Sequence, residues 1–415
     1  MADGIPRPWQ AVYPSTGPVA DTPRYCVALT PTEPEVNRFT APDILALPHP
    51  VRVDAAVGEP IEARLLQRLG LFATAQPHLC DSHATTEWIL NRVPGMRDAA
   101  LASMGAPGSY NIGTFMLLLA RARLRAHGDP ILEVSAPLQA LLAETDLGEG
   151  LPARFFHCPY PVAYIAFARP CPLRISNRAS GLHEVEGAYV GSYLVPPQDP
   201  LHESTVRATA LGLDPDRPTR VVEITITGSP IGKRNALDDA SQDFALFIQD
   251  EDACLGTLLA RHNAYYSSPA ARDTPGFEAP QPREVALSTQ VIEALAKVLL
   301  YLNLPEAGQL PLPERSDLER RLRQLGPKKA ARFKRRLAKA YDRILIGPAT
   351  DPAAPSEVPS LPTGAEPHHS LRPHWRRGHF RRIRYGEQLS EHRLGWIRPV
   401  LVNAAEAFAP VKAKP

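Results

Sequence analysis

The residues best suited to chemistry lie near the carboxyl end, where arginines alternate with aromatic rings between residues 374 and 386. Planar guanidinium groups can fork onto phosphates, and aromatic rings can stack on bases. A strand-like apolar run at 396–402 follows and carries one more arginine. We therefore predict a nucleic-acid-binding surface, with no catalytic role, made of Trp375, Arg376, Arg377, His379, Arg381, Arg382, Arg384, Tyr385 and Arg398.

If this stretch forms a strand, arginines occupy both of its faces. Arg377 and Arg381 would share one face, whereas Arg382 and Arg384 would share the other with Phe380. Because a buried guanidinium group without a partner is costly, at least one face needs an anion. That anion is either nucleic acid, with Phe380 among the stacking rings, or a set of carboxylates elsewhere in the chain.

A second basic element is predicted upstream, as an amphipathic helix over residues 328–344. Phe333, Leu337 and Tyr341 fall on one apolar face at a spacing of four. A proline-rich linker at 347–367, partly polyproline II, separates this helix from the tail. The helix adds cations on another face to the predicted nucleic-acid-binding set: Lys328, Arg332, Arg335 and Lys339.

Two alternatives stay open. His374 or His379 could act as a general acid or base while an arginine holds the phosphate, which would make the protein a phosphodiester-cleaving nuclease. The carboxylates nearest in sequence that could orient these imidazoles are Glu387 and Glu391. The other alternative is a protein-interaction factor whose tail docks internally on the rest of the chain.

Other chemistries find little support, and we expect neither a metal nor a cofactor. The segment between Gly228 and Arg234 has three residues between its glycines and arginine where a phosphate loop needs Ser or Thr, so we predict a turn. One cluster contains residue types that bind zinc, but no second ligand pair with matching spacing exists. We therefore predict an ordinary loop for this cluster, which consists of His78, Cys80, Asp81 and His83.

Charge and cysteine usage narrow the class further. The formal net charge of the 415 residues is +2, but residues 326–398 hold 16 Lys and Arg against 6 Asp and Glu, which leaves −8 for the rest. This separation indicates a polyanion-binding end on an acidic body. Five scattered cysteines without a C-x-x-C pair, and the absence of a long apolar run, predict a cytoplasmic protein without membrane contact.

Hydrophobic periodicity predicts an α+β fold. Ile61, Leu65 and Leu69 show helical spacing, whereas Val222 and Ile224 alternate with polar residues as in a half-buried strand. We expect a central antiparallel sheet with helices on one side. The predicted regions are an extended Pro-rich segment (1–58), a mostly helical region (59–150), an α+β region ending in the basic helix (151–346), the linker (347–367) and a small, basic, β-containing C-terminal module (368–415).

The C-terminal module resembles one known family. The run from His374 to Gly386, followed by the run from Trp396 to Val402, is similar to the C-terminal region of type V-A anti-CRISPR-like proteins, over about residues 368–403. Phe380 stands where another tryptophan is expected. The positions that match are His374, Trp375, Arg376, Arg377, Gly378, His379, Arg381, Tyr385, Ile397, Arg398, Pro399 and Val400.

The resemblance implies a regulatory protein of a phage, plasmid or other mobile element. The studied anti-CRISPR member of the family lowers the amount of a type V CRISPR nuclease by promoting loss of its mRNA during translation, and it recognises the emerging N-terminal part of that nuclease. The partners implied for this chain are therefore RNA, in particular mRNA, a ribosome–nascent chain complex, and a CRISPR effector polypeptide.

Overall fold

The structure is a computed structural model that describes residues 39–348 and 374–402 apart from internal gaps. Residues 39–348 are called the body below. Most of the predicted linker, and the predicted binding residues Lys328, Arg332 and Arg335, lie outside the described residues. The gaps are 69, 105–111, 149, 178–180, 200–204, 232–235, 237–238, 269–270, 272–281, 327–329, 331–332, 335 and 338.

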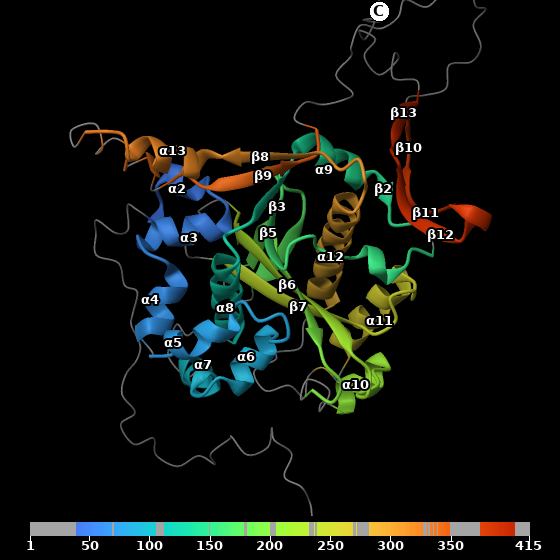
Figure 1. Cartoon of the computed structure of the whole chain (residues 1–415), viewed down its shortest axis with the longest axis horizontal. Coiled ribbons are helices and arrows are strands. Elements are labelled where there is room, and N and C mark those ends of the chain that lie inside the picture. The colour runs from blue at the N-terminus through green and yellow to red at the C-terminus, as the bar shows by residue number, and fades with distance from the viewer. Residues whose placement is uncertain are drawn as a thin grey trace, which may run out of the picture.

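One large sheet forms the centre of the body (Figure 1). Its order is β7-β6-β5-β3-β1-β9-β8, with β4 paired to β5. Most neighbours are antiparallel, but β1 pairs in parallel with both β3 and β9. The strands are β1 (Ile131–Val134), β3 (Val162–Ala166), β4 (Arg174–Asn177), β5 (Gly181–Val195), β6 (Thr219–Pro230), β7 (Ala240–Ile248), β8 (Gln309–Pro313) and β9 (Asp342–Ile346).

Helices cover both faces of this sheet. The α-helices in the described residues are α2 (Pro42–Leu45), α3 (His49–Val57), α4 (Ile61–Arg68), α5 (Phe72–Ala75), α6 (Thr86–Arg92), α7 (Met96–Met104), α8 (Ile112–Ala126), α9 (Ala136–Ala143), α10 (Thr205–Leu211), α11 (Leu255–Ser267), α12 (Pro282–Leu302) and α13 (Glu314–Leu322). The main core lies between the sheet and α9, α11 and α12. On the opposite face, α8 packs against the tyrosines of β3 and β5.

The helix ends follow from local chemistry in the sequence. Thr85 and Ser135 cap α6 and α9, because their hydroxyls accept hydrogen bonds from the backbone N–H of Trp88 and Leu138. Gly128, two residues after α8, takes the left-handed conformation with φ 86°. Helices and a central sheet occur together in the body, so the predicted α+β class is confirmed.

Several details differ from expectation. The sheet is mixed rather than antiparallel, because β1 enters it in parallel register, and helices cover both of its faces. Residues 42–57 form α2 and α3 instead of an extended segment. The predicted basic helix does not reach residue 344, because Asp342–Ile346 form β9, where pairing with β1 and β8 overrides the helical pattern.

By length and composition alone, α12 could cross a membrane, although 56% of its most apolar window is buried inside the protein. Val291, Leu295, Val298 and Leu302 face the main core. Burial in the core accounts for the apolar character of this helix.

The C-terminal module attaches to the body through a small strand. β10 (His374–Arg376) pairs with β13 (Val400–Val402), and β11 (Gly378–Tyr385) forms an antiparallel hairpin with β12 (Glu391–Ile397). β11 also pairs in parallel with β2 (Thr145–Asp146), which follows α9. Figure 1 shows this hairpin at the edge of the body, beside β2 and on the far side from α13.

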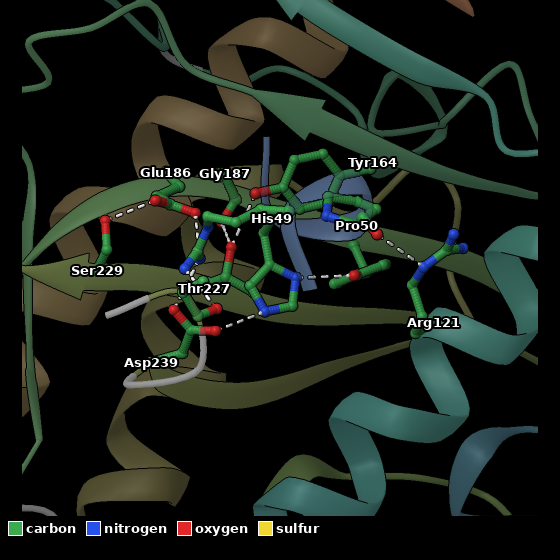
Figure 2. A network of polar contacts seen from close by, with 12 residues as sticks. His49, Pro50, Arg121, Tyr164, Glu186, Gly187, Thr227, Ser229 and Asp239 are labelled. Atoms are coloured by element: carbon green, nitrogen blue, oxygen red, sulfur yellow. Dashed lines mark hydrogen bonds and ion pairs between the residues drawn. The ribbon is translucent and has the colours of Figure 1, made fainter. Parts of the chain in front are cut away.

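A buried network of charges joins α3 to the sheet (Figure 2). The guanidinium group of Arg52, which is fully buried, donates to Glu186 on β5 at 2.8 Å and to Asp239 at 2.7 Å. His49 lies 3.2 Å from Asp239 and contacts the Tyr189 hydroxyl at 2.9 Å. Burial alone would raise the pKa of Asp239, but Arg52 and His49 outweigh it and hold that pKa below its usual value.

Candidate nucleic-acid interface

Aromatic packing anchors the β11–β12 hairpin on the body. Phe380 is only 1% exposed, and it stacks on Trp396 directly across the hairpin with ring centroids 5.8 Å apart. Trp396 meets Tyr301 of α12 edge to face and donates from Nε1 to the hydroxyl of Thr145 at 3.2 Å. Leu394 is buried in the same core. At this end the hairpin therefore packs into the main core of the body.

Phe380 was expected to stack on bases, and this prediction is wrong. Its ring belongs to the main core, where no nucleic acid can reach it. Phe380 instead stacks on Trp396 in this core, and the packing of the two rings fixes the hairpin in place. Of the tail aromatics whose side chains are described, Tyr385 is the exposed one, at 42%.

Glycines allow the close approach of hairpin and body. Gly378 donates its N–H to the Glu144 carbonyl at 2.9 Å, and a Cβ there would lie 2.6 Å from the Ile397 carbonyl oxygen. Gly148, with φ 81°, lies so near β11 that a Cβ would sit 2.0 Å from the carbonyl oxygen of Phe380. A side chain at either position would force the strands apart.

One face of the hairpin points away from Phe380 and is called the outer face. It carries His379, Arg381, Ile383 and Tyr385 from β11, with Arg393 opposite Ile383. Arg381 and Arg393 are exposed, and within the described residues neither forms an ion pair. The outer face therefore presents guanidinium groups that no carboxylate of the described chain neutralises.

Tyr385 and Arg393 also contact each other on this face. The guanidinium carbon of Arg393 lies 5.8 Å from the centre of the Tyr385 ring. A hydrogen bond to Glu391, directly across the hairpin, raises the pKa of the Tyr385 hydroxyl. The ring is thus held at the surface beside a cation, an arrangement suited to stacking on a base next to a phosphate.

The opposite, inner face begins with the buried rings and continues beyond them toward the turn. There Arg382 lies opposite Leu394, and Arg384 lies opposite His392. Both arginines are exposed and form no ion pair among the described residues. Desolvation lowers the pKa of His392, and the positive charges of Arg382, Arg384 and Arg154 lower it further.

One predicted arginine does pair internally. Arg377 donates to Asp146 of β2 at 3.0 Å, but both side chains are more than half exposed. An exposed pair of this kind contributes about 0–1 kcal/mol to stability. The sequence left two kinds of anion open, nucleic acid or a carboxylate of the chain. Arg377 pairs with a carboxylate of the body, whereas the arginines of β11 and β12 form no ion pair among the described residues.

The remaining predicted residues fall in different places. Arg376 is exposed on β10, and the guanidinium carbon of Arg398 lies 5.5 Å from the Trp396 ring. The side chain of Trp375 lies outside the described residues. Lys339 pairs with Asp43 of α2, which Figure 1 draws on the opposite side of the body from the hairpin. The structure does not bring Lys339 into the hairpin surface.

Sequence reasoning missed two cations near the hairpin. Arg393 could have been found, because pairing β11 with the following run places it across from Ile383. Arg154 lies more than two hundred residues away on the short helix η2 (Ala153–Phe155), and no local pattern marks it. Its effect on His392 is visible only in the folded chain.

The structure also places the residues of the other chemistries. His379 lies opposite Asp146 in the parallel β11–β2 register, and the Asp146 carboxylate pairs with Arg377. In the predicted loop, His83 contacts the Leu194 carbonyl and Cys80 contacts the Ala126 carbonyl. A groove of about 610 Å³ between α3, α8 and α13 is lined by paired charges such as Arg121 with Asp54.

Comparison with known proteins places most of this architecture in one family. The family model described as AcrVA2-like, anti-CRISPR type V subtype A2 family, matches residues 132–404, from β1 to just past β13. Among solved structures, a crystal structure of AcrVA2 shares 13% sequence identity at a TM-score of 0.41, and the match covers 82% of this chain and 97% of that chain. No curated protein matches the chain.

Proposed function

Because the chain belongs to the anti-CRISPR type V subtype A2 family, we propose that it lowers the amount of a type V CRISPR nuclease by acting on the mRNA of that nuclease during translation. In this proposal the protein works in the cytoplasm of a bacterium that carries the mobile element. Its partners are the mRNA and the ribosome that translates it, together with the emerging CRISPR polypeptide.

The observation that carries the RNA part is the outer face of the hairpin. Arg381 and Arg393 are exposed without a carboxylate partner among the described residues, and Tyr385 stands between the turn and Arg393. Guanidinium groups that neutralise phosphates release condensed counterions, which makes such binding strongly salt-dependent. Because Phe380 and Trp396 fix the hairpin, the backbone that carries its arginines is ordered before RNA arrives, and less backbone freedom is lost on binding.

Salt-dependent RNA binding tests this directly. We expect the full-length protein to retain a fluorescently labelled single-stranded RNA, with affinity falling as salt rises. Arg381→Ala with Arg393→Ala should reduce the slope of log affinity against log salt by about 0.7 for each phosphate contact removed. Arg320→Ala, at an exposed and ion-paired position on α13, is the control and should change nothing. Absence of binding by the unaltered protein at low salt would refute RNA contact.

The anti-CRISPR part needs a cellular readout. In bacteria that express a type V nuclease, the protein should lower both the mRNA and the protein level of that nuclease, and the Arg381→Ala, Arg393→Ala variant should not. An untranslated copy of the same mRNA, with its start codon removed, is the control and should keep its level. Loss of nuclease activity at unchanged mRNA level would point to direct inhibition of the polypeptide instead.

A second candidate function has one specific observation behind it. The β11–β2 register sets His379 opposite Asp146, so an imidazole and a carboxylate occupy neighbouring strand positions, and phosphodiester cleavage uses these two kinds of group. If the protein is a nuclease, incubation with labelled RNA yields fragments, and His379→Ala abolishes cleavage while RNA is still retained. Intact RNA after incubation with the unaltered protein removes this candidate.

A further inference from the structure

The inner face of the hairpin holds cations that the proposed outer-face contact leaves unused. Arg382 and Arg384 lie on the same side of β11 as the buried ring of Phe380, but further along toward the turn. At this distance from the anchored end the side chains are exposed, so the body no longer covers them. His392 lies directly opposite Arg384 on β12 and completes the row.

Arg154 faces this row from the body. It belongs to η2, whose position is fixed by hydrogen bonds from the N–H groups of Ala153 and Arg154 to the carbonyls of Ala253 and Glu251. Its side chain is 48% exposed, and its neighbours Ala153 and Phe156 pack in the same core as Leu394 of β12. The charge of Arg154 also contributes to the lowered pKa of His392. Two elements that are far apart in sequence therefore direct positive charge at the same place.

The charges at this place repel one another, and little in the fold compensates for them. The charged groups that face His392 are Arg382 and Arg384 from β11 and Arg154 from η2, and together with desolvation they lower its pKa. Asp252 is the carboxylate that pairs with Arg154, and at 67% exposed it is held only loosely. Neighbouring like charges destabilise a fold unless an anion is bound between them.

We propose that Arg154, Arg382, Arg384 and His392 form a phosphate-binding site that joins the hairpin to the body and takes a phosphodiester of single-stranded RNA. The inference rests on the proposed function, because it names where the RNA backbone continues after the outer face. In this arrangement Asp252 pairs with Arg154 in the free protein, and the phosphate replaces Asp252 as the partner of Arg154.

Substitutions of opposite sign test the site in the full-length protein, with a fluorescein-labelled single-stranded oligouridylate as the probe. Arg154→Ala should weaken binding about tenfold at low salt and reduce the salt slope by about 0.7. Asp252→Asn should strengthen binding, because it frees Arg154. Arg315→Ala is the matched control, since Arg315 is 50% exposed and paired with Glu319 in the same way, and it should leave binding unchanged.

A pH titration gives a readout that a structural role would not produce. A bound phosphate favours the charged imidazole, so RNA affinity should rise as the pH falls from about 7 to about 5. His392→Asn should remove this rise while nearly preserving affinity at pH 7. His83→Asn, at an exposed histidine of the body that contacts the Leu194 carbonyl, is the control and should keep the rise.

The outcomes separate this inference from the function on which it rests. If the unaltered protein binds no RNA, the proposed RNA contact itself fails. If it binds RNA and the Arg381→Ala, Arg393→Ala variant is weakened, but Arg154→Ala and Asp252→Asn behave like Arg315→Ala, then RNA uses the outer face alone and the bridging site is refuted. Preference for an acidic polypeptide over oligouridylate at the same net charge would also overturn the assignment to phosphate.

Discussion

Replacing Gly148 with alanine should detach the C-terminal hairpin from the body. Gly148 lies between β2 and η2 with φ 81°, and a Cβ there would stand 2.0 Å from the carbonyl oxygen of Phe380. Gly150 offers a matched control in the same loop, because its φ is 68° and no atom lies within 4 Å of its Cβ position. Both substitutions strain the backbone, but only the first meets the hairpin.

The structure sets the magnitude of the difference. An alanine in the left-handed region costs about 1–2 kcal/mol at either position. At Gly148 the contact must also lengthen from 2.0 Å to at least 3.0 Å, and the atom in the way is backbone. The hairpin must therefore shift, which disturbs the stacked, buried ring of Phe380. Since complete loss of a buried phenylalanine costs about 3–5 kcal/mol, we expect Gly148→Ala to be less stable than Gly150→Ala by about 3 kcal/mol.

Hydrogen exchange measured by mass spectrometry distinguishes a detached hairpin from a weakened body. In Gly148→Ala, amides of β11 and β12 should exchange much faster, while amides of α12 and β6 keep their protection. In Gly150→Ala, all four elements should exchange as in the unaltered protein. Equal protection of β11 and β12 in both variants would refute the reasoning, because the hairpin would then tolerate a side chain against its backbone.

Three further predictions concern the body and its junction with the hairpin. Arg52→Met should lower the free energy of unfolding by about 3–5 kcal/mol in urea titrations, since its two carboxylate partners stay buried without it, and a change below 1 kcal/mol would contradict a coupled network. Burial lowers the pKa of His262 from 6.5 to about 4, so stability should be constant above about pH 6.5 and fall by up to about 3 kcal/mol toward pH 4; His262→Gln should show a shallower fall. Trp396→Phe should cost about 1 kcal/mol in thermal unfolding, because the ring stack remains while the bond to Thr145 is lost, and an unchanged melting temperature would argue against that bond.

Local signals predicted much of the secondary structure. Thr85 and Ser135 are the caps of α6 and α9, because a hydroxyl that bonds to a backbone N–H three residues on acts within one turn. The alternation around Val222 likewise became the long strand β6. Such features need no distant partner, so a sequence shows them directly.

Non-local pairing explains what was mispredicted. The segment at Asp342–Ile346 has helical spacing, yet pairing with β1 and β8 makes it a strand. The sequence did not predict β1, because four residues are too few for a strand alternation to be recognised between two helical segments. The parallel β1–β3 pair accounts for α9, which lies in the connection that crosses over one face of the sheet, whereas α8 on the opposite face precedes β1.

The candidate interface divides in the same way. The types and order of residues 374–398 determined that the tail is basic, aromatic and able to form strands, and they carried the family resemblance that the family model confirmed. Only the tertiary structure decided which rings are buried, which arginines stay free, and that Arg154 and Asp146 lie beside the hairpin. The physical reason is range: charge and ring identity are properties of single residues, whereas burial and electrostatic convergence depend on contacts between segments more than two hundred residues apart.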